Sequence, residues 1–280
     1  MASNRFNGSF PTSFTRMPWL VLLSLYGNQF TGAIPDLSGM TSMVRLNVGF
    51  NNFASIPDCF GNMPNLLYLT LYYNIFQGVV PPSIKNLTNL LVLQLHSNQF
   101  TSISDDLFAN MPNLYYLTLG ILPYLSPKPQ VPSSIASLKN LQYLDISSGP
   151  YIKIQDNIFQ NLTALKTLNM NAMSYMTGQL PSSLGNLTAL TSISMTSSLL
   201  SGSFPTALSG MLTLRTLNIQ NSASIILDTN SACSRTWTSC NAAGTNTCKP
   251  SSGCTCTVPT SPICVQSLPS SKVDSHTETL

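Results

Sequence analysis

Charged side chains are scarce in this chain of 280 residues, where Lys, Arg, Asp and Glu together make up 8%, against about 25% in an ordinary soluble protein. The net charge is +3, and the sequence has no basic cluster. Nucleic acid binding needs a concentrated positive face, so we exclude it. Because 43% of the residues are hydrophobic, a large core can be buried under a surface of Ser, Thr, Asn and Gln. Such a surface suits a secreted protein.

Long apolar runs are also missing. No stretch approaches the roughly 18 consecutive apolar residues of a membrane-spanning helix, and residues 19–23 recur as an ordinary repeat strand. The N-terminus lacks the charged and then apolar pattern of a signal peptide. We therefore expect no membrane span within this chain, and the N-terminus does not report the compartment.

Catalytic motifs are absent as well. The sequence has no G-x-S-x-G, no H-E-x-x-H, no phosphate-binding loop and no kinase signature. His96 has no nearby Ser or Cys nucleophile, and general acid–base catalysis needs a positioned partner. Arg45 and Asp145 are isolated charges rather than a carboxylate pair. We predict that the protein is not an enzyme and uses no cofactor or metal.

The chain does contain a strong internal repeat. The motif L-x-x-L-x-L returns at intervals of 23 to 27 residues. Its leucines point to one side of a short strand and the intervening residues to the other. One unit cannot bury its apolar side alone, but stacked units can, with their strands in one parallel sheet. The units begin at Leu20, Met43, Leu66, Leu90, Leu114, Leu141, Leu165, Leu190 and Leu214.

An asparagine follows each of the first four strands, where its amide can hydrogen-bond the backbone of adjoining coils. These residues are Asn28, Asn51, Asn74 and Asn98. The later positions of the same column are Leu122, Gly149, Met173, Ser198 and Ser222. We therefore expect less regular and looser coils after about residue 120.

A second phrase, N-x-F-x-G-x-(I/V/F)-P, occurs at residues 4–11, 28–35 and 74–81. Together with the strand motif, it resembles the plant-type subclass of the leucine-rich-repeat family over roughly residues 4–227. The sequence is thus similar to plant receptor ectodomains, polygalacturonase-inhibiting proteins and protist surface antigens. The resemblance implies an α/β solenoid, shaped as a horseshoe or arc. Its parallel sheet would line the concave face, with loops and short helical turns on the convex side.

The chain begins in the second half of a repeat unit, since Asn4 falls in the asparagine column ahead of Asn28. A solenoid needs a cap over its first coil, and residues 1–19 offer none. We therefore expect Met1 to be a truncated or internal start.

Two kinds of unit alternate roughly as far as Leu165. One ends in a Pro-Ser phrase, at residues 82–84 and 181–184, and the other in Asp-Leu-Phe or Asn-Ile-Phe, at residues 106–108 and 157–159. In the second kind, Asp or Asn can accept backbone N–H bonds at the start of a short helical turn, and we expect Phe to plug the convex side of the core. The proline-rich residues 122–129 indicate a bulging loop, either a tolerated insertion or a ligand contact.

Aromatic residues concentrate on the exposed strand face of the first six units, and small polar residues occupy the last three. Tyrosine combines a large contact area with a hydrogen-bonding tip and loses little rotamer entropy, although it is also simply a good strand residue. We predict a binding site for a protein, peptide or glycan. Its candidate residues are Tyr26, Phe50, Tyr68, Tyr72, Tyr73, His96, Tyr116 and Tyr143.

Four Asn-x-Ser/Thr sequons are glycosylation candidates if the chain is secreted. Three of them lie four residues before a unit start, where Asn can also close a helical turn in the left-handed conformation. This structural role is an alternative explanation of the same residues. The sequons begin at Asn7, Asn86, Asn161 and Asn186.

Six cysteines crowd the C-terminal part of the chain amid Ser, Thr, Gly and Pro. They are Cys233, Cys240, Cys248, Cys254, Cys256 and Cys264. We predict three disulfides of unknown pairing, because the stretch has too few apolar residues to fold without them. Zinc is the rival explanation, but no His lies near and no C-x-x-C pair occurs. Cys59, alone in the repeats, is expected to be a half-buried free thiol.

We therefore divide the chain into a partial first repeat (1–19), a solenoid of about nine repeats (20–230), a cysteine-rich segment (231–264) and a disordered polar tail (265–280). Disulfides favour an oxidising compartment. We predict an extracellular or cell-surface recognition module without catalytic activity, which binds a protein, peptide or glycan on its concave face. A secreted inhibitor of cell-wall-degrading enzymes, a structural surface coat and an intracellular scaffold are the alternatives.

Overall fold

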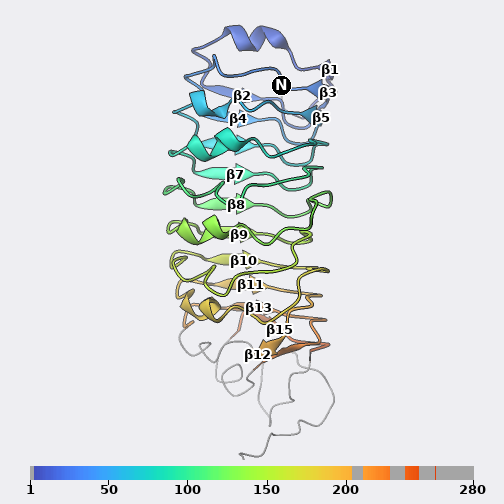
Figure 1. Cartoon of the computed structure of the whole chain (residues 1–280), viewed down its shortest axis with the longest axis vertical. Helices are drawn as coiled ribbons and strands as arrows, with labels where there is room; N and C mark the ends of the chain where they lie inside the picture. The colour runs from blue at the N-terminus through green and yellow to red at the C-terminus, as the bar shows by residue number, and fades with distance from the viewer. Residues whose placement is uncertain (1–2, 204–210, 228–236, 246–255, 257–280) are drawn as a thin grey trace, which may run out of the picture.

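The computed structural model describes residues 3–203, 211–227, 237–245 and 256, and these residues wind into one elongated solenoid (Figure 1). Within them, ten short strands from successive coils pair in parallel as one sheet, which confirms the predicted architecture. In sheet order, the strands are β2 (Leu22–Ser24), β4 (Arg45–Asn47), β6 (Tyr68–Thr70), β7 (Val92–Gln94), β8 (Tyr116–Thr118), β9 (Tyr143–Asp145), β10 (Thr167–Asn169), β11 (Ser192–Ser194), β13 (Thr216–Asn218) and β15 (Ser239–Asn241).

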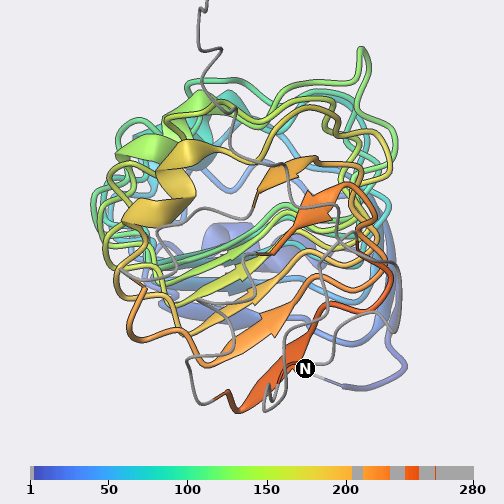
Figure 2. The same ribbon diagram turned by 90° about the horizontal axis from the view of Figure 1, so that it is seen from below.

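The first two copies of the N-x-F-x-G phrase and the equivalent residues of the next coil form a second, smaller parallel sheet on another side of the coil. Strands β1 (Asn7–Ser9), β3 (Gln29–Ala33) and β5 (Asn52–Ser55) pair in that order, and β12 (Gly202–Ser203) pairs with β14 (Ile225–Ile226) at the other end. Figure 2, a view along the solenoid, shows the ten-stranded sheet on one side and the helices and smaller strands around the rest.

Leucines and phenylalanines fill the interior between these surfaces. The last two leucine-type residues of each L-x-x-L-x-L motif are buried, as the alternation predicted. The phenylalanine of the N-x-F phrase stacks from coil to coil, with ring centroids 6.0 Å apart for Phe30 and Phe53 and 6.0 Å apart for Phe76 and Phe100. The predicted plugs of the second kind of unit, Phe108 and Phe159, are fully buried.

Short 3-10 helices, rather than α-helices, lie beside the sheet in the described coils. They are η1 (Thr12–Arg16), η2 (Phe60–Asn62), η3 (Pro82–Asn86), η4 (Ser133–Ser137) and η5 (Ser182–Asn186). None of the helices in the described part of the chain has the length and apolar character needed to cross a lipid bilayer.

The two alternating kinds of unit form hydrogen-bonded pairs. A carboxylate oxygen of Asp156 accepts the Ser182 N–H at 2.6 Å, at the start of η5, and the Ser183 hydroxyl accepts the Phe159 N–H at 3.2 Å in return. The same reciprocal pattern joins Asp58 to Ser83 and Asp105 to Ser133, with Phe60 bonded to Ser83 and Phe108 to Ser134. The sequence predicted that Asp106 and Asn157 would cap the turns that they begin. The carboxylates of Asp58, Asp105 and Asp156 instead cap the helix of the next coil.

The asparagine column forms the predicted ladder inside the first coils. The Asn74 side-chain amide donates to the Val48 carbonyl at 3.0 Å and to the Leu71 carbonyl at 3.1 Å, and its oxygen accepts the Phe53 N–H at 3.0 Å. Each amide therefore satisfies buried backbone groups of its own coil and of the preceding one. Asn51 and Asn98 repeat this arrangement.

The expectation of less regular coils after about residue 120 was wrong, because strand pairing continues in register to β15. Other side chains replace the lost asparagines. The Tyr151 ring fills the space beside Gly149, and its hydroxyl lies 3.5 Å from the Leu119 carbonyl. Ser222 donates to the Met195 carbonyl at 2.5 Å. That the second half is looser stays a prediction.

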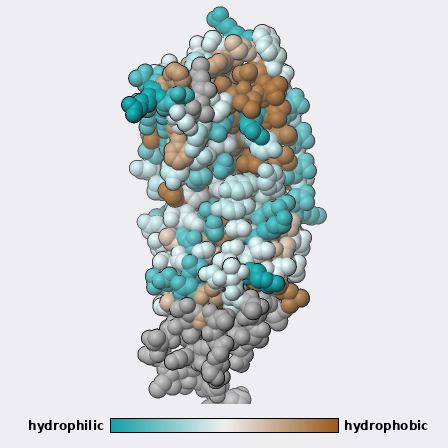
Figure 3. Space-filling model, turned by 180° about the vertical axis from the view of Figure 1, so that it is seen from behind, coloured by the Kyte–Doolittle hydropathy of each residue, from teal (hydrophilic) through white to brown (hydrophobic). Residues whose placement is uncertain are grey.

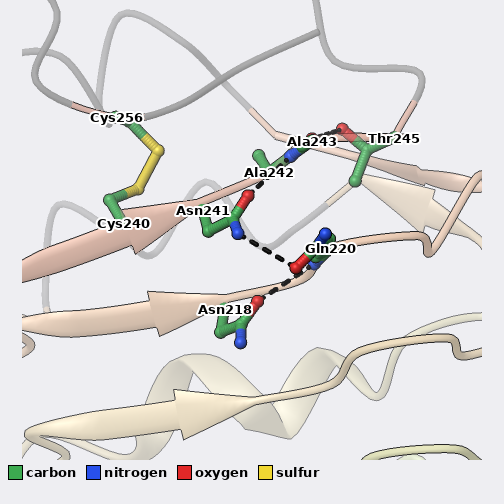
Figure 4. The surroundings of a disulfide bond; sticks show 8 residues. All are labelled: Asn218, Gln220, Cys240, Asn241, Ala242, Ala243, Thr245 and Cys256. Atoms are coloured by element: carbon green, nitrogen blue, oxygen red, sulfur yellow. Dashed lines mark hydrogen bonds between the residues drawn. A yellow bond between two sulfur atoms is a disulfide. The ribbon is translucent and has the colours of Figure 1, made fainter.

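The ten-stranded sheet extends beyond the boundary drawn at residue 230, because β15 lies in the cysteine-rich segment. Cys240 of β15 is bonded to Cys256, one disulfide of the predicted set (Figure 4). The remaining cysteines of the segment and the tail at 265–280 lie outside the described residues. Cys59 is a free thiol and is buried rather than half-buried; its burial raises its pKa.

The proline-rich loop at 122–129 is anchored to the solenoid. Leu122 and Leu125 are buried, and the Ser126 N–H donates to the Thr101 carbonyl at 3.0 Å. The Lys128 ammonium lies 3.1 Å from the centroid of the Tyr175 ring. The loop is thus part of the coil wall, and the Tyr124 side chain in it is exposed.

Replacing Asn74 with Ala should lower the free energy of unfolding by about 2–3 kcal/mol, because the Phe53 N–H and two carbonyls lose a buried partner. Chemical denaturation measures this difference. Asn89→Ala is the matched control, since Asn89 is exposed and its amide makes one bond, to the Pro64 carbonyl. Equal losses in the two variants would contradict the ladder's role.

Candidate functional site

The strand face is the surface made by the third, fifth and seventh residues of each unit, which point away from the buried leucines. In the unit that begins at Leu66, these residues are Tyr68, Thr70 and Tyr72. Because each strand pairs in register with the next, equivalent positions stack into three columns across the sheet. All eight predicted site residues lie on or beside this face.

Five of them form one contiguous aromatic cluster, made of Tyr26, Phe50, Tyr72, Tyr73 and His96 from four consecutive coils. Ring centroids are 5.4 Å apart for Tyr26 and Phe50, 4.3 Å for Phe50 and Tyr73, and 4.7 Å for Tyr72 and His96. Phe50 and Tyr73 remain 41% and 45% exposed. The cluster is therefore an exposed surface of rings that hold one another in place.

Glycine and left-handed backbone position these rings. A Cβ atom on Gly49 would lie 3.2 Å from the Tyr72 ring, so the missing side chain lets that ring lie against the neighbouring coil. Phe50 and Tyr73 occupy the residue before the asparagine column, with φ of 52° and 50°. This left-handed conformation, which is uncommon for residues other than glycine, turns their side chains outward at the end of each strand.

The other three predicted residues belong to two separate groups. Tyr116 and Tyr143 stack with centroids 4.3 Å apart and planes 5° apart, and the Asn169 amide donates to the Tyr143 hydroxyl at 3.0 Å. Burial, aided by the negative charge of Asp145, raises the pKa of Tyr143 to about 12. Tyr68 instead lies under the guanidinium of Arg45, whose Cζ is 4.3 Å from the ring centroid.

His96 is held within the face by two neighbours. Its Nδ1 lies 2.6 Å from the Thr118 hydroxyl, and its ring stacks on Tyr72. Burial lowers the pKa of His96, and the nearby charge of Asp145 opposes this shift. Burial therefore favours the neutral imidazole, which serves as a fifth aromatic ring of the cluster.

The sequence-based site missed the fifth column and the second residue of each unit. The fifth column supplies the polar partners of the aromatic rings, and period-two alternation would have placed it on the same side. Its members in the central coils are Thr70, Gln94, Thr118, Asp145 and Asn169.

The second residue of each unit forms an apolar edge in the first four coils. Its members, Val21, Val44, Leu67 and Leu91, are all partly exposed. Figure 3, which views the strand face, shows hydrophobic residues gathered over the N-terminal coils at the upper right. In the last four units this position becomes polar, as Gln142, Lys166, Thr191 and Arg215. The N-terminal half of the face is thus the apolar half.

A hollow of about 340 Å³ adjoins the aromatic cluster at the ends of the strands. Phe50, Tyr73, Ile75 and Ser97 line it together with asparagines of the ladder. The four sequon asparagines, by contrast, lie exposed away from the cluster, and Asn86 and Asn186 end η3 and η5.

The environment of His96 predicts its titration. Its pKa should lie below 6.5, and Asp145→Asn should lower it further, because the variant removes a negative charge that stabilises the imidazolium. NMR titration of the ring protons measures both values, with His276→Gln as the background so that His96 is the single histidine. A pKa above 6.5, or a rise in the Asp145 variant, would contradict this environment.

Comparisons with known proteins identify the fold. A leucine-rich-repeat family model matches residues 71–120. A solved TDR receptor structure is similar to the chain at 23% identity with a TM-score of 0.75, covering 87% of this chain and 42% of that one. The Arabidopsis receptor kinase HAESA ectodomain, in complex with an IDA peptide hormone ligand, is 24% identical with a TM-score of 0.56 and coverages of 80% and 42%.

An internalin from Listeria monocytogenes is 19% identical with a TM-score of 0.57, covering 89% of this chain and 81% of that one. A comparison with curated proteins finds no match. The chain spans less than half of the TDR receptor and HAESA structures, at 42% of each. The family match at residues 71–120 and the repeated coil with its asparagine ladder show that the chain has the fold of a leucine-rich-repeat solenoid, similar to these solved structures.

Proposed function

We propose that this protein is a non-catalytic recognition module that binds a peptide or protein on its strand face. The observation that carries the proposal is the aromatic cluster, in which exposed rings from four coils contact one another. Such rings provide a large contact area and are ordered before binding, so little conformational entropy is lost. Leucine-rich-repeat proteins are typically non-catalytic binding modules, which supports the same function.

Peptides are favoured over glycans as ligands. The HAESA ectodomain that resembles this chain is in complex with a peptide hormone, and a second similar structure, at 24% identity and a TM-score of 0.55, is the plant peptide hormone receptor RGFR1 in complex with RGF2. A row of parallel strands with outward tyrosines, polar side chains and an apolar edge offers both stacking and hydrogen bonds to an extended chain.

We further propose an extracellular or cell-surface location. The Cys240–Cys256 disulfide supports it, because disulfides persist in oxidising compartments. The scarcity of charge and the similarity to receptor ectodomains agree with it. In such a compartment, the exposed sequon asparagines would be open to glycosylation.

Tyr72→Ala and Tyr116→Ala should each weaken peptide binding at least tenfold, since aromatic anchors at interfaces commonly contribute about 2 kcal/mol or more. The ligand is a peptide selected on the wild-type protein from a display library, and calorimetry gives its Kd. Tyr124→Ala, in the loop at 122–129, is the matched control and should bind normally. Wild-type affinity in both strand-face variants, with the fold intact, would instead favour a structural coat.

Glycosylation of the sequons has a direct test. Protein purified from its native source should lose mass on treatment with an N-glycosidase, and the loss should shrink when Asn86, Asn161 or Asn186 is replaced by Gln. These three asparagines are exposed at the helical edge, where a glycan would leave the strand face open. An unchanged mass would show that the recurring asparagine serves the turn alone.

A further inference from the structure

The strand face has an unusual distribution of charge. Among the described coils, its three columns contain just two charged side chains, Arg45 in β4 and Asp145 in β9. Neither forms an ion pair within the described residues. The salt bridge found among those residues joins Lys85 to Asp106, away from this face. A lone positive group and a lone negative group therefore face solvent across a neutral aromatic surface.

Arg45 is exposed and held in place by the Tyr68 ring, with its Cζ 4.3 Å from the ring centroid. Stacking occupies one flat face of the guanidinium and leaves its N–H groups at the edge available. That edge matches the two oxygens of a carboxylate. The side chain is thus pre-oriented for an acidic group of a ligand.

Asp145 is half-buried, and one of its oxygens accepts the Ser147 N–H at 2.8 Å. The second oxygen has no hydrogen-bond partner in the described part of the chain, and the stacked pair of Tyr116 and Tyr143 flanks the carboxylate closely enough to feel its charge. A carboxylate beside aromatic faces suits an ammonium or guanidinium group.

The separation of the two charges sets the length of the ligand. Strands β4, β6, β7, β8 and β9 are consecutive in the sheet, and strands lie about 4.8 Å apart, so four steps cover about 19 Å. With the offset from the third to the fifth column, the distance is about 20 Å. An extended peptide rises about 3.3 Å per residue and covers this distance in about six residues.

We propose that the ligand is an extended peptide that crosses the strands with an acidic residue at Arg45 and a basic residue, about six positions away, at Asp145. Apolar or aromatic residues between them would lie over Tyr68 and Val92, and the partly exposed Gln94 would offer hydrogen bonds. This inference rests on the proposed function and adds the charge pattern and direction of the ligand.

Burial explains why the pattern should be selective. A ligand that covers Asp145 without supplying a cation leaves a desolvated charge unpaired, and one with the reverse polarity adds repulsion at both ends. A neutral glycan would desolvate both Arg45 and Asp145 without supplying an opposite charge to either. A peptide with the matching charges avoids them.

The test is a display selection with random linear peptides of about ten residues on four folded proteins: wild type, Arg45→Glu, Asp145→Lys and the double variant. Wild type should enrich an acidic and a basic residue about six positions apart. Each single variant should lose one of these preferences and bind the wild-type peptides roughly tenfold more weakly. The double variant should enrich peptides of reversed polarity.

Lys139→Glu is the matched control, since Lys139 is exposed and lies before the strand, outside the three columns. If a charge reversal fails to fold, Arg45→Gln and Asp145→Asn replace it and should weaken the wild-type peptides in the same direction. Selected peptides that depend on Tyr72 but carry no charge pattern would overturn this inference alone. If the selection on wild-type protein yields no peptide that binds it more tightly than it binds Tyr72→Ala, the proposed function fails as well.

Discussion

The structure depends on satisfying the backbone groups that each coil buries just after its strand. There the chain turns through a left-handed residue, and its carbonyls point into an apolar core where water is excluded. An unpaired buried carbonyl or N–H costs free energy comparable to a lost hydrogen bond. The buried amides of Asn51, Asn74 and Asn98 meet this demand across neighbouring coils, and in the second half Tyr151 and Ser222 do so by different chemistry.

The opposite edge of the coil is held by a second set of bonds. Asp58, Asp105 and Asp156 cap the 3-10 helix of the next coil, and a serine of that coil bonds back to the backbone of the first. This explains the alternation of two kinds of unit, because each kind supplies one half of the pair. With both edges of the coil bonded to its neighbours, the register between strands has little freedom.

That rigidity bears directly on recognition. Rings from four coils meet in one cluster because the strands that carry them are held in register. Arg45 and Asp145 likewise keep a constant separation across five strands. A preordered face of this kind can discriminate between ligands by spacing and polarity, since it cannot move to relieve a mismatch.

Much of this architecture could be predicted from the sequence. The repeat spacing indicated the parallel sheet, the alternation separated buried leucines from outward tyrosines, and the asparagine column predicted the ladder. The grouping of the site could not be predicted. Eight aromatic candidates divide into the cluster, the stacked Tyr116 and Tyr143, and Tyr68 under Arg45.

The sequence by itself determined the fold, because one repeated apolar period satisfies burial in every coil. The tertiary structure alone decided which side chains meet, how Tyr151 compensates for a missing asparagine, and which coil each aspartate caps. Those contacts join residues more than twenty positions apart, and their partners depend on the register and rotation of stacked coils, which no single unit encodes.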